Sequence, residues 1–121
     1  MRDYKKYSIW MDSHQLTLVI YRLTKAYPKD EINGVISQIR RAMSSAPTNI
    51  AEGSGRDTDK DFKWFLTIAH ASATEVEYWL LLSFELEYIT KEDFTVLTEK
   101  IVTLRKQIHA LIKKLTPANG Y

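Results

Sequence analysis

Residues 32–56, INGVISQIRRAMSSAPTNIAEGSGR, decide the fold of this 121-residue chain. Apolar side chains recur along this stretch every three or four residues, as on one face of an α-helix: Ile32, Val35, Ile36, Ile39, Ala42, Met43, Ala46 and Ile50. We expect residues 29–31 to open the helix and Gly53 and Gly55 to end it, since glycine commonly follows a last turn. Pro47 lies inside the helix and is expected to kink or split it, because proline removes a backbone donor.

The segments on either side show the same periodicity. Residues 12–26 are predicted to form a first helix, which Tyr27 ends because a residue before proline is pushed out of the helical region. Asp57 or Thr58 can cap a third helix, which is expected to run to about Glu87.

The last helix has the most regular pattern. Thr90 caps it, and its apolar positions over residues 94–115 form a sustained heptad. No strand pattern competes, and short connections favour antiparallel neighbours. We therefore predict an all-α protein with an antiparallel up-down-up-down four-helix bundle. It forms a single domain over residues 1–121, with an N-terminal arm of about residues 1–10 and a frayed tail of about residues 117–121.

The composition is that of a globular protein with a core. Hydrophobic residues make up 45% of the chain, charged residues make up 26%, and the net charge of +2 is too small to identify a partner. Cysteine is absent, which excludes disulfides and thiolate chemistry. No apolar run approaches the ~20 residues of a membrane span. The N-terminal residues lack the apolar core of a signal peptide. We expect a cytoplasmic protein without a membrane partner.

No catalytic or metal-binding constellation stands out. A di-iron site in a four-helix bundle needs Glu-x-x-His pairs on facing helices, and none of His14, His70 and His109 follows a glutamate by three residues. Ser44 and Ser45 lack a neighbouring histidine and a strained nucleophile turn. We predict that the protein is not an enzyme and holds no metal or cofactor.

A polar stripe lies opposite the apolar one on the helix of residues 32–56: Ser37, Arg41, Ser44, Ser45, Thr48, Asn49 and Glu52. One interpretation is a structural network that fixes the helix register, with candidate members Ser37, Asn49, Glu52 and Glu75. It would pair Arg40 or Arg41 with one of the glutamates. The other interpretation is that one arginine faces outward and binds phosphate. Both can hold, because adjacent residues on a helix point about 100° apart.

Two kinds of surface are predicted from the remaining residues. Clustered cations attract phosphate, and the candidate nucleic-acid contacts are Arg40, Arg41, Arg56, Lys60 and Lys63. Small residues permit close helix approach, and the third helix has more aromatics than one inner face can hold, which suggests self-association. The candidate interface residues are Ala42, Ser45, Trp64, Tyr78 and Trp79. Close packing inside one bundle is the alternative for the small residues.

A long gapped motif resembles a known family. Its elements are Ser37-Gln-Ile-Arg-Arg-Ala42, Ser45, Pro47, Asn49-Ile-Ala-Glu-Gly53 and Gly55-Arg56. They are similar to the signature of the bacterial four-helix bundle proteins of the S23 ribosomal type, which are encoded by intervening sequences in 23S ribosomal RNA genes. Trp10 stands where the family has a tryptophan, and the third helix matches at Phe62, Phe65, Leu66, Ala69, Ser72, Glu75 and Glu77. Met11-Asp12, after the tryptophan, departs from the family pattern, and this difference concerns only the start of a helix.

The resemblance implies a four-helix bundle that assembles into a homopentameric ring. It also implies kinship with the accessory variability protein of diversity-generating retroelements, a pentameric barrel that binds nucleic acid and a reverse transcriptase. Two functions of different classes follow. The first is a non-enzymatic oligomer that binds nucleic acid, RNA or DNA, through its basic surface, most concretely structured, rRNA-associated RNA. The alternative is a helical adaptor that docks a protein partner such as a reverse transcriptase.

Overall fold

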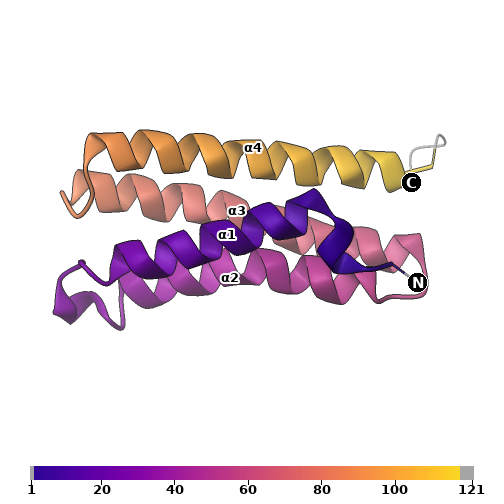
Figure 1. Cartoon of the computed structure of the whole chain (residues 1–121), viewed down its shortest axis with the longest axis horizontal. Coiled ribbons are helices and arrows are strands. Elements are labelled where there is room, and N and C mark those ends of the chain that lie inside the picture. The colour runs from indigo at the N-terminus through magenta and orange to yellow at the C-terminus, as the bar shows by residue number, and fades with distance from the viewer. Residues whose placement is uncertain (1, 118–121) are drawn as a thin grey trace.

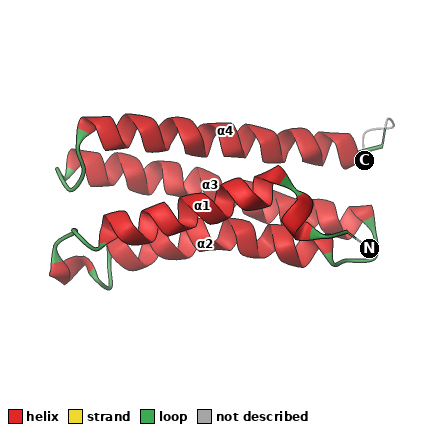
Figure 2. Cartoon of the chain, in the orientation of Figure 1, coloured by secondary structure: helices red, strands yellow, loops and turns green. Residues whose placement is uncertain are grey.

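A computed structural model describes residues 2–117, and long antiparallel helices account for most of them. The elements are, in order, η1 (Tyr4–Lys6), α1 (Ser8–Thr24), η2 (Lys29–Glu31), α2 (Val35–Ser54), α3 (Asp59–Glu85) and α4 (Lys91–Leu115). The helices lie side by side and successive ones run in opposite directions (Figure 1). Short loops join them, and residues 2–117 contain no strand (Figure 2). The predicted up-down-up-down four-helix bundle is therefore confirmed.

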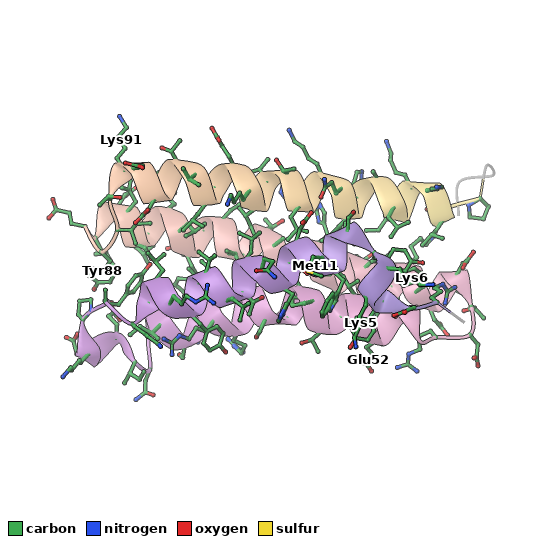
Figure 3. All side chains as sticks on the ribbon, viewed as in Figure 1. Lys5, Lys6, Met11, Glu52, Tyr88 and Lys91 are labelled. Atoms are coloured by element: carbon green, nitrogen blue, oxygen red, sulfur yellow. The ribbon has the colours of Figure 1, made fainter. Side chains whose placement is uncertain are left out.

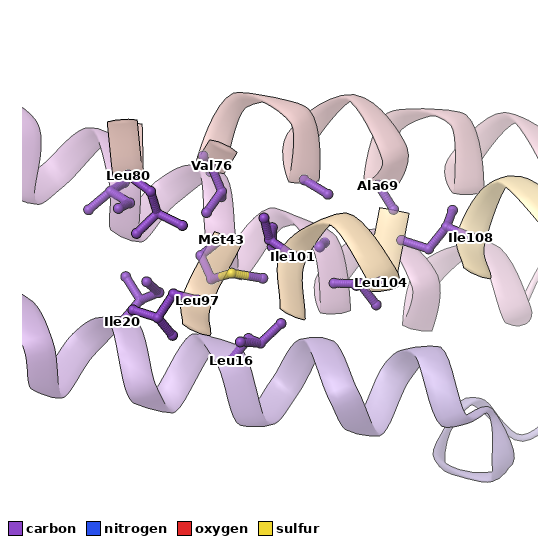
Figure 4. Packing of buried hydrophobic residues seen from close by; sticks show 14 of the residues in the cluster. Leu16, Ile20, Met43, Ala69, Val76, Leu80, Leu97, Ile101, Leu104 and Ile108 are labelled. Atoms are coloured by element: carbon purple, nitrogen blue, oxygen red, sulfur yellow. The ribbon is translucent and has the colours of Figure 1, made fainter. Parts of the chain in front are cut away.

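The core runs the length of the bundle and takes side chains from all four helices. Leu16 and Ile20 of α1 and Met43 of α2 face α3 and α4 in the middle of the bundle (Figure 4). The heptad of α4 supplies Leu97, Ile101, Leu104 and Ile108, each buried. The periodicity that predicts the helices therefore also identifies the residues that hold them together.

Side chains set the helix ends. The hydroxyl oxygens of Thr58 and Thr90 each accept a hydrogen bond from the backbone N–H three residues on, at 3.1 Å, and so cap α3 and α4 as predicted. Helix α3 ends two residues before the predicted Glu87. That residue adopts a left-handed φ of 65°, and Tyr88 N–H donates back to the carbonyl of Ser83 at 2.8 Å. This is the Schellman arrangement, with a glutamate where glycine is usual.

The first helix begins earlier than the predicted residue 12, inside the predicted arm of about residues 1–10. Helix α1 begins at Ser8, and Tyr4–Lys6 form a short 3-10 turn before it. The reason is tertiary, since Ile9 is buried and the ring of Tyr7 packs edge-on against Phe62 at 5.7 Å. At the other end α4 stops at Leu115, and residues 118–121 of the predicted tail lie outside the described residues.

The second helix also differs from the prediction at its start. Residues 29–31 form a separate 3-10 turn, and α2 begins after Gly34. Ile32, which the periodicity assigns to the buried stripe, precedes the helix and is 53% exposed.

Pro47 neither splits α2 nor ends it, because the helix is continuous from Val35 to Ser54. Proline has no N–H to donate to the carbonyl four residues earlier, which belongs to Met43. The hydroxyl of Thr17 on α1 lies 3.4 Å from that carbonyl oxygen and 2.7 Å from the carbonyl oxygen of Ser13. The hydroxyl has a single proton and its shorter contact is to Ser13, so it compensates the Met43 carbonyl only weakly.

Helix α1 packs chiefly on α2 and only lightly on α4. A groove of about 420 Å³ runs between α1 and α4, with Leu16 and Leu104 on its apolar floor and Gln15 and Lys100 among the polar residues on its walls. Among residues 2–117, no helix combines the length and the apolar character needed to cross a membrane.

Candidate nucleic-acid interface

The adjacent arginines of α2 point in different directions, as the helix geometry predicts. Arg40 turns toward α1, where its Nε donates to the hydroxyl of Thr24 at 2.8 Å and its guanidinium lies 4.8 Å from the centre of the Tyr21 ring. Arg41 is exposed and donates to Gln38 one turn earlier. Of the two arginines, Arg41 is the one that presents its charge to solvent.

The four candidate members of the structural network do not form one network. Glu52 pairs with Arg56 at 3.3 Å, and Glu75 accepts a hydrogen bond from the indole of Trp79 at 3.0 Å. Ser37 donates to the backbone carbonyl of Gly34 at 3.2 Å. Glu52 and Glu75 thus bond to partners one turn away on their own segments, and Arg40 bonds across to α1.

Asn49 does take part in a link between two helices. Its side-chain amide donates to the carbonyl and the hydroxyl of Ser45, at 2.8 and 3.0 Å. Ser45 in turn lies 2.9 Å from the hydroxyl of Ser72 on α3. Three small polar side chains therefore bridge α2 and α3, and their size lets the helices approach closely. Ser72 enters this link although the predicted network omits it.

The five predicted nucleic-acid contacts fall into separate places. Arg56, Lys60 and Lys63 lie together around the α2–α3 connection. Arg41 lies on α2 fifteen residues before Arg56, which is about 20 Å along a helix. Arg56 pairs with Glu52, and its guanidinium covers the Phe65 ring at 4.7 Å. The five candidates therefore do not form a continuous patch: three cluster at the connection, Arg41 is exposed by itself on α2, and Arg40 turns toward α1.

The two ends of the bundle differ in charge. We call the end with the α2–α3 connection the basic end. Among residues 2–117 it carries the cations Arg2, Lys5, Lys6, Arg56, Lys60, Lys63, Lys113 and Lys114 and fewer acids, which are Asp3, Glu52, Asp57, Asp59 and Asp61. At the acidic end, the acids Asp30, Glu31, Glu85, Glu87, Glu92 and Asp93 outnumber the cations Arg22, Lys25, Lys29 and Lys91. Figure 3 shows Lys5, Lys6 and Glu52 toward the basic end and Tyr88 and Lys91 toward the acidic end.

The candidate interface residues divide by burial. Ala42 is only 4% exposed within the bundle core, so its side chain packs α2 and is not part of a surface. Ser45 belongs to the link with α3 described above. Trp79 packs partly against the core. Trp64 and Tyr78 remain exposed, at 62% and 54%, on the outer face of α3.

Two pairs between α3 and α4 were missed from the sequence. Arg105 donates to Glu77 at 2.6 Å, and the rings of His70 and His109 lie 5.7 Å apart. Partial burial lowers the pKa of His70, with further lowering from Arg105 and His109 against an opposing effect of Glu77. When two helices run antiparallel, the residue numbers of contacting pairs add up to a nearly constant value. That rule could have predicted both pairs from the sequence. Within residues 2–117, no three His, Asp or Glu side chains gather as metal ligands would.

The fold and this surface define a class of protein: an antiparallel four-helix bundle with ends of opposite charge balance. The chain belongs to the family of 23S rRNA-intervening sequence proteins, whose model matches residues 5–110. A solved structure of a Bacteroides thetaiotaomicron protein of unknown function, from the S23 ribosomal protein family, superposes with a TM-score of 0.80. Its identity to this chain is 29%, and the match covers 87% of this chain and 95% of that one. No curated protein matches the chain. The family resemblance of the motif over residues 37–56 is confirmed.

Proposed function

We infer that this protein binds structured RNA as a homo-oligomer, in the cytoplasm and without catalysing a reaction. The observation that carries the proposal is the excess of cations at the basic end, where Arg56 and Lys60 are exposed. Such a cluster binds a phosphate backbone favourably, because each neutralised phosphate releases a counterion. Family membership supports RNA as the polyanion, since the family is named after the intervening sequences of 23S ribosomal RNA.

The test measures binding of a labelled RNA hairpin by fluorescence anisotropy over a range of salt concentrations. We expect the affinity to fall steeply with salt, because phosphate contacts dominate. The double variant Arg56→Gln, Lys60→Gln should weaken binding by roughly tenfold and reduce the salt slope by about two. The matched control, Lys29→Gln with Lys91→Gln, removes the same charge from the acidic end and should change the affinity little. Salt-insensitive binding, or equal loss in both double variants, contradicts the proposal.

The oligomer is tested separately by light scattering on nuclease-treated protein. One chain has a mass of 14.1 kDa, and we expect a mass near five chains from the family resemblance. Assembly would add the basic ends of several copies into one field, which strengthens attraction to RNA. A monomer at working concentration would contradict the oligomer and leave the basic end of a single bundle to account for any binding.

The outer face of α3 favours a second candidate, an adaptor that docks a protein. Tyr78 and Leu81 are 54% and 41% exposed, and large exposed apolar groups mark interaction surfaces. A purified reverse transcriptase that binds after nuclease treatment, and that Tyr78→Glu releases, would favour the adaptor. RNA binding that persists in Tyr78→Glu would favour the first function.

A further inference from the structure

Trp64 is the most exposed large apolar side chain in the described part of the chain, at 62%. It lines a pocket of about 390 Å³ between the start of α3 and the end of α4. Leu115 and Pro117 form the apolar wall on the α4 side, and Lys60 and Lys63 line the pocket from α3. The residues of α3 share a face because positions three and four apart on a helix are neighbours. An aromatic plane and two ammonium groups therefore border the same pocket.

The charges around the pocket favour an anionic occupant. Asp59, the acid that lines it, already pairs with Arg2 at 2.5 Å. Lys113 and Lys114, in the last turn of α4, add cations at the same end of the bundle. A purely apolar protein segment placed on Trp64 would have to take the ammonium groups beside it out of water, which is costly.

Other exposed aromatics lack this combination. Tyr78 is 54% exposed, and its neighbour one turn earlier on the same face is the acid Glu75. The face of the Tyr21 ring is covered by the guanidinium of Arg40 at 4.8 Å. Only at Trp64, among these three, does a large uncovered ring stand beside cations.

We propose that the Trp64 pocket holds an unpaired nucleobase of the bound RNA, with the base stacked on the indole and the adjacent phosphates against Lys60 and Lys63. Aromatic planes flanked by cations are the means by which proteins hold single-stranded nucleic acid, because every base has a face that can stack. Paired bases in a duplex cannot reach the ring. The pocket thus directs the protein to loops, bulges and ends of structured RNA. This inference rests on the proposed RNA binding and specifies which part of the RNA is recognised.

The experiment compares two RNA probes with equal numbers of phosphates, a hairpin with an unpaired loop and a blunt duplex, on the full chain in its native assembly. We expect the hairpin to bind more tightly and Trp64→Ala to remove that preference, weakening hairpin binding about tenfold. The matched control Tyr78→Ala removes another exposed aromatic, 54% exposed, from the same helix and should keep the preference. Far-UV circular dichroism and mass confirm that each variant folds and assembles as the parent does.

A second readout places the base at the ring. Hairpin RNA should quench tryptophan emission in the parent, and the conservative Trp64→Phe should lose the quenching while it retains much of the affinity. A DNA hairpin of the same sequence shows whether the sugar contributes. If Trp64→Ala and the parent prefer the hairpin equally, the pocket assignment is overturned while RNA binding stands. If neither probe binds, both proposals fail together.

Discussion

Gly53 lies where α2 packs closely against α3, and an added methyl group there should destabilise the fold. A Cβ on Gly53 would lie 2.6 Å from the Cβ of Phe65 and 3.0 Å from Cδ1 of Phe62. The Phe65 Cβ is fixed to the backbone of α3, so no rotamer change relieves the overlap and the helices must move apart. Overpacking of this kind costs about 1–3 kcal/mol. The better helix propensity of alanine offsets roughly 0.5–1 kcal/mol of that cost.

The expected net effect of Gly53→Ala is a loss of about 0.5–2 kcal/mol in the free energy of unfolding, or a fall of roughly 5 °C in Tm. The assay is thermal and urea unfolding followed by circular dichroism, at one protein concentration because assembly also shifts apparent stability. Gly55→Ala is the matched control, since its Cβ would meet only a carbonyl oxygen at 3.6 Å. That variant should be neutral or slightly stabilised. If Gly53→Ala proves as stable as Gly55→Ala, the close-packing argument is refuted.

Three further predictions concern single residues. The lowered pKa of His70 means that the unfolded chain binds its proton more readily, so stability should be full above about pH 6.5 and fall below it. Arg105→Gln should raise that pKa, measured by NMR titration, and lessen the loss in acid. The hydrogen bond to Glu31 at 2.7 Å raises the pKa of Tyr88 to about 12. The stabilisation from Tyr88 is then present below pH 10.0 and lost as the pH approaches 12, and the stability of Tyr88→Phe should lack this alkaline decline. Glu87→Gly should raise the free energy of unfolding, measured with urea, by up to about 1 kcal/mol, because glycine adopts a positive φ without strain. A lower free energy of unfolding would show that the side chain of Glu87 stabilises the fold by more than its backbone strain costs.

Periodicity predicts the four helices because each helix buries one face, and the apolar residues of that face recur every three or four positions in the sequence. The start of α1 could not be predicted in the same way, because contacts of Ile9 and Tyr7 with the rest of the bundle create it. Pro47 shows the same limit. Its local effect is to break a helix, yet α2 stays continuous from Val35 to Ser54 where it packs in the bundle.

The candidate site was predictable in part for the same reason. Helical spacing correctly separates the directions of Arg40 and Arg41, but only the packing of α1 on α2 shows that Thr24 captures Arg40. The grouping of Arg56 with Lys60 follows from a short connection in the sequence. The pocket beside Trp64 needs the end of α4 to lie next to the start of α3, which the sequence implies only through the antiparallel topology.

The light contact between α1 and α4 has a consequence for the order in which the bundle opens. Helices α2 and α3 pack most extensively. Helix α1 packs mainly on α2, and the groove described above separates part of it from α4. Local openings begin where the fewest apolar contacts are lost. Backbone amides of α1 should therefore exchange with solvent hydrogen at lower free energy than those at the centre of α3. If α1 detached while α2, α3 and α4 stayed packed, Leu16, Leu104 and their neighbours would become exposed. A second copy or a partner helix could then bind there without global unfolding.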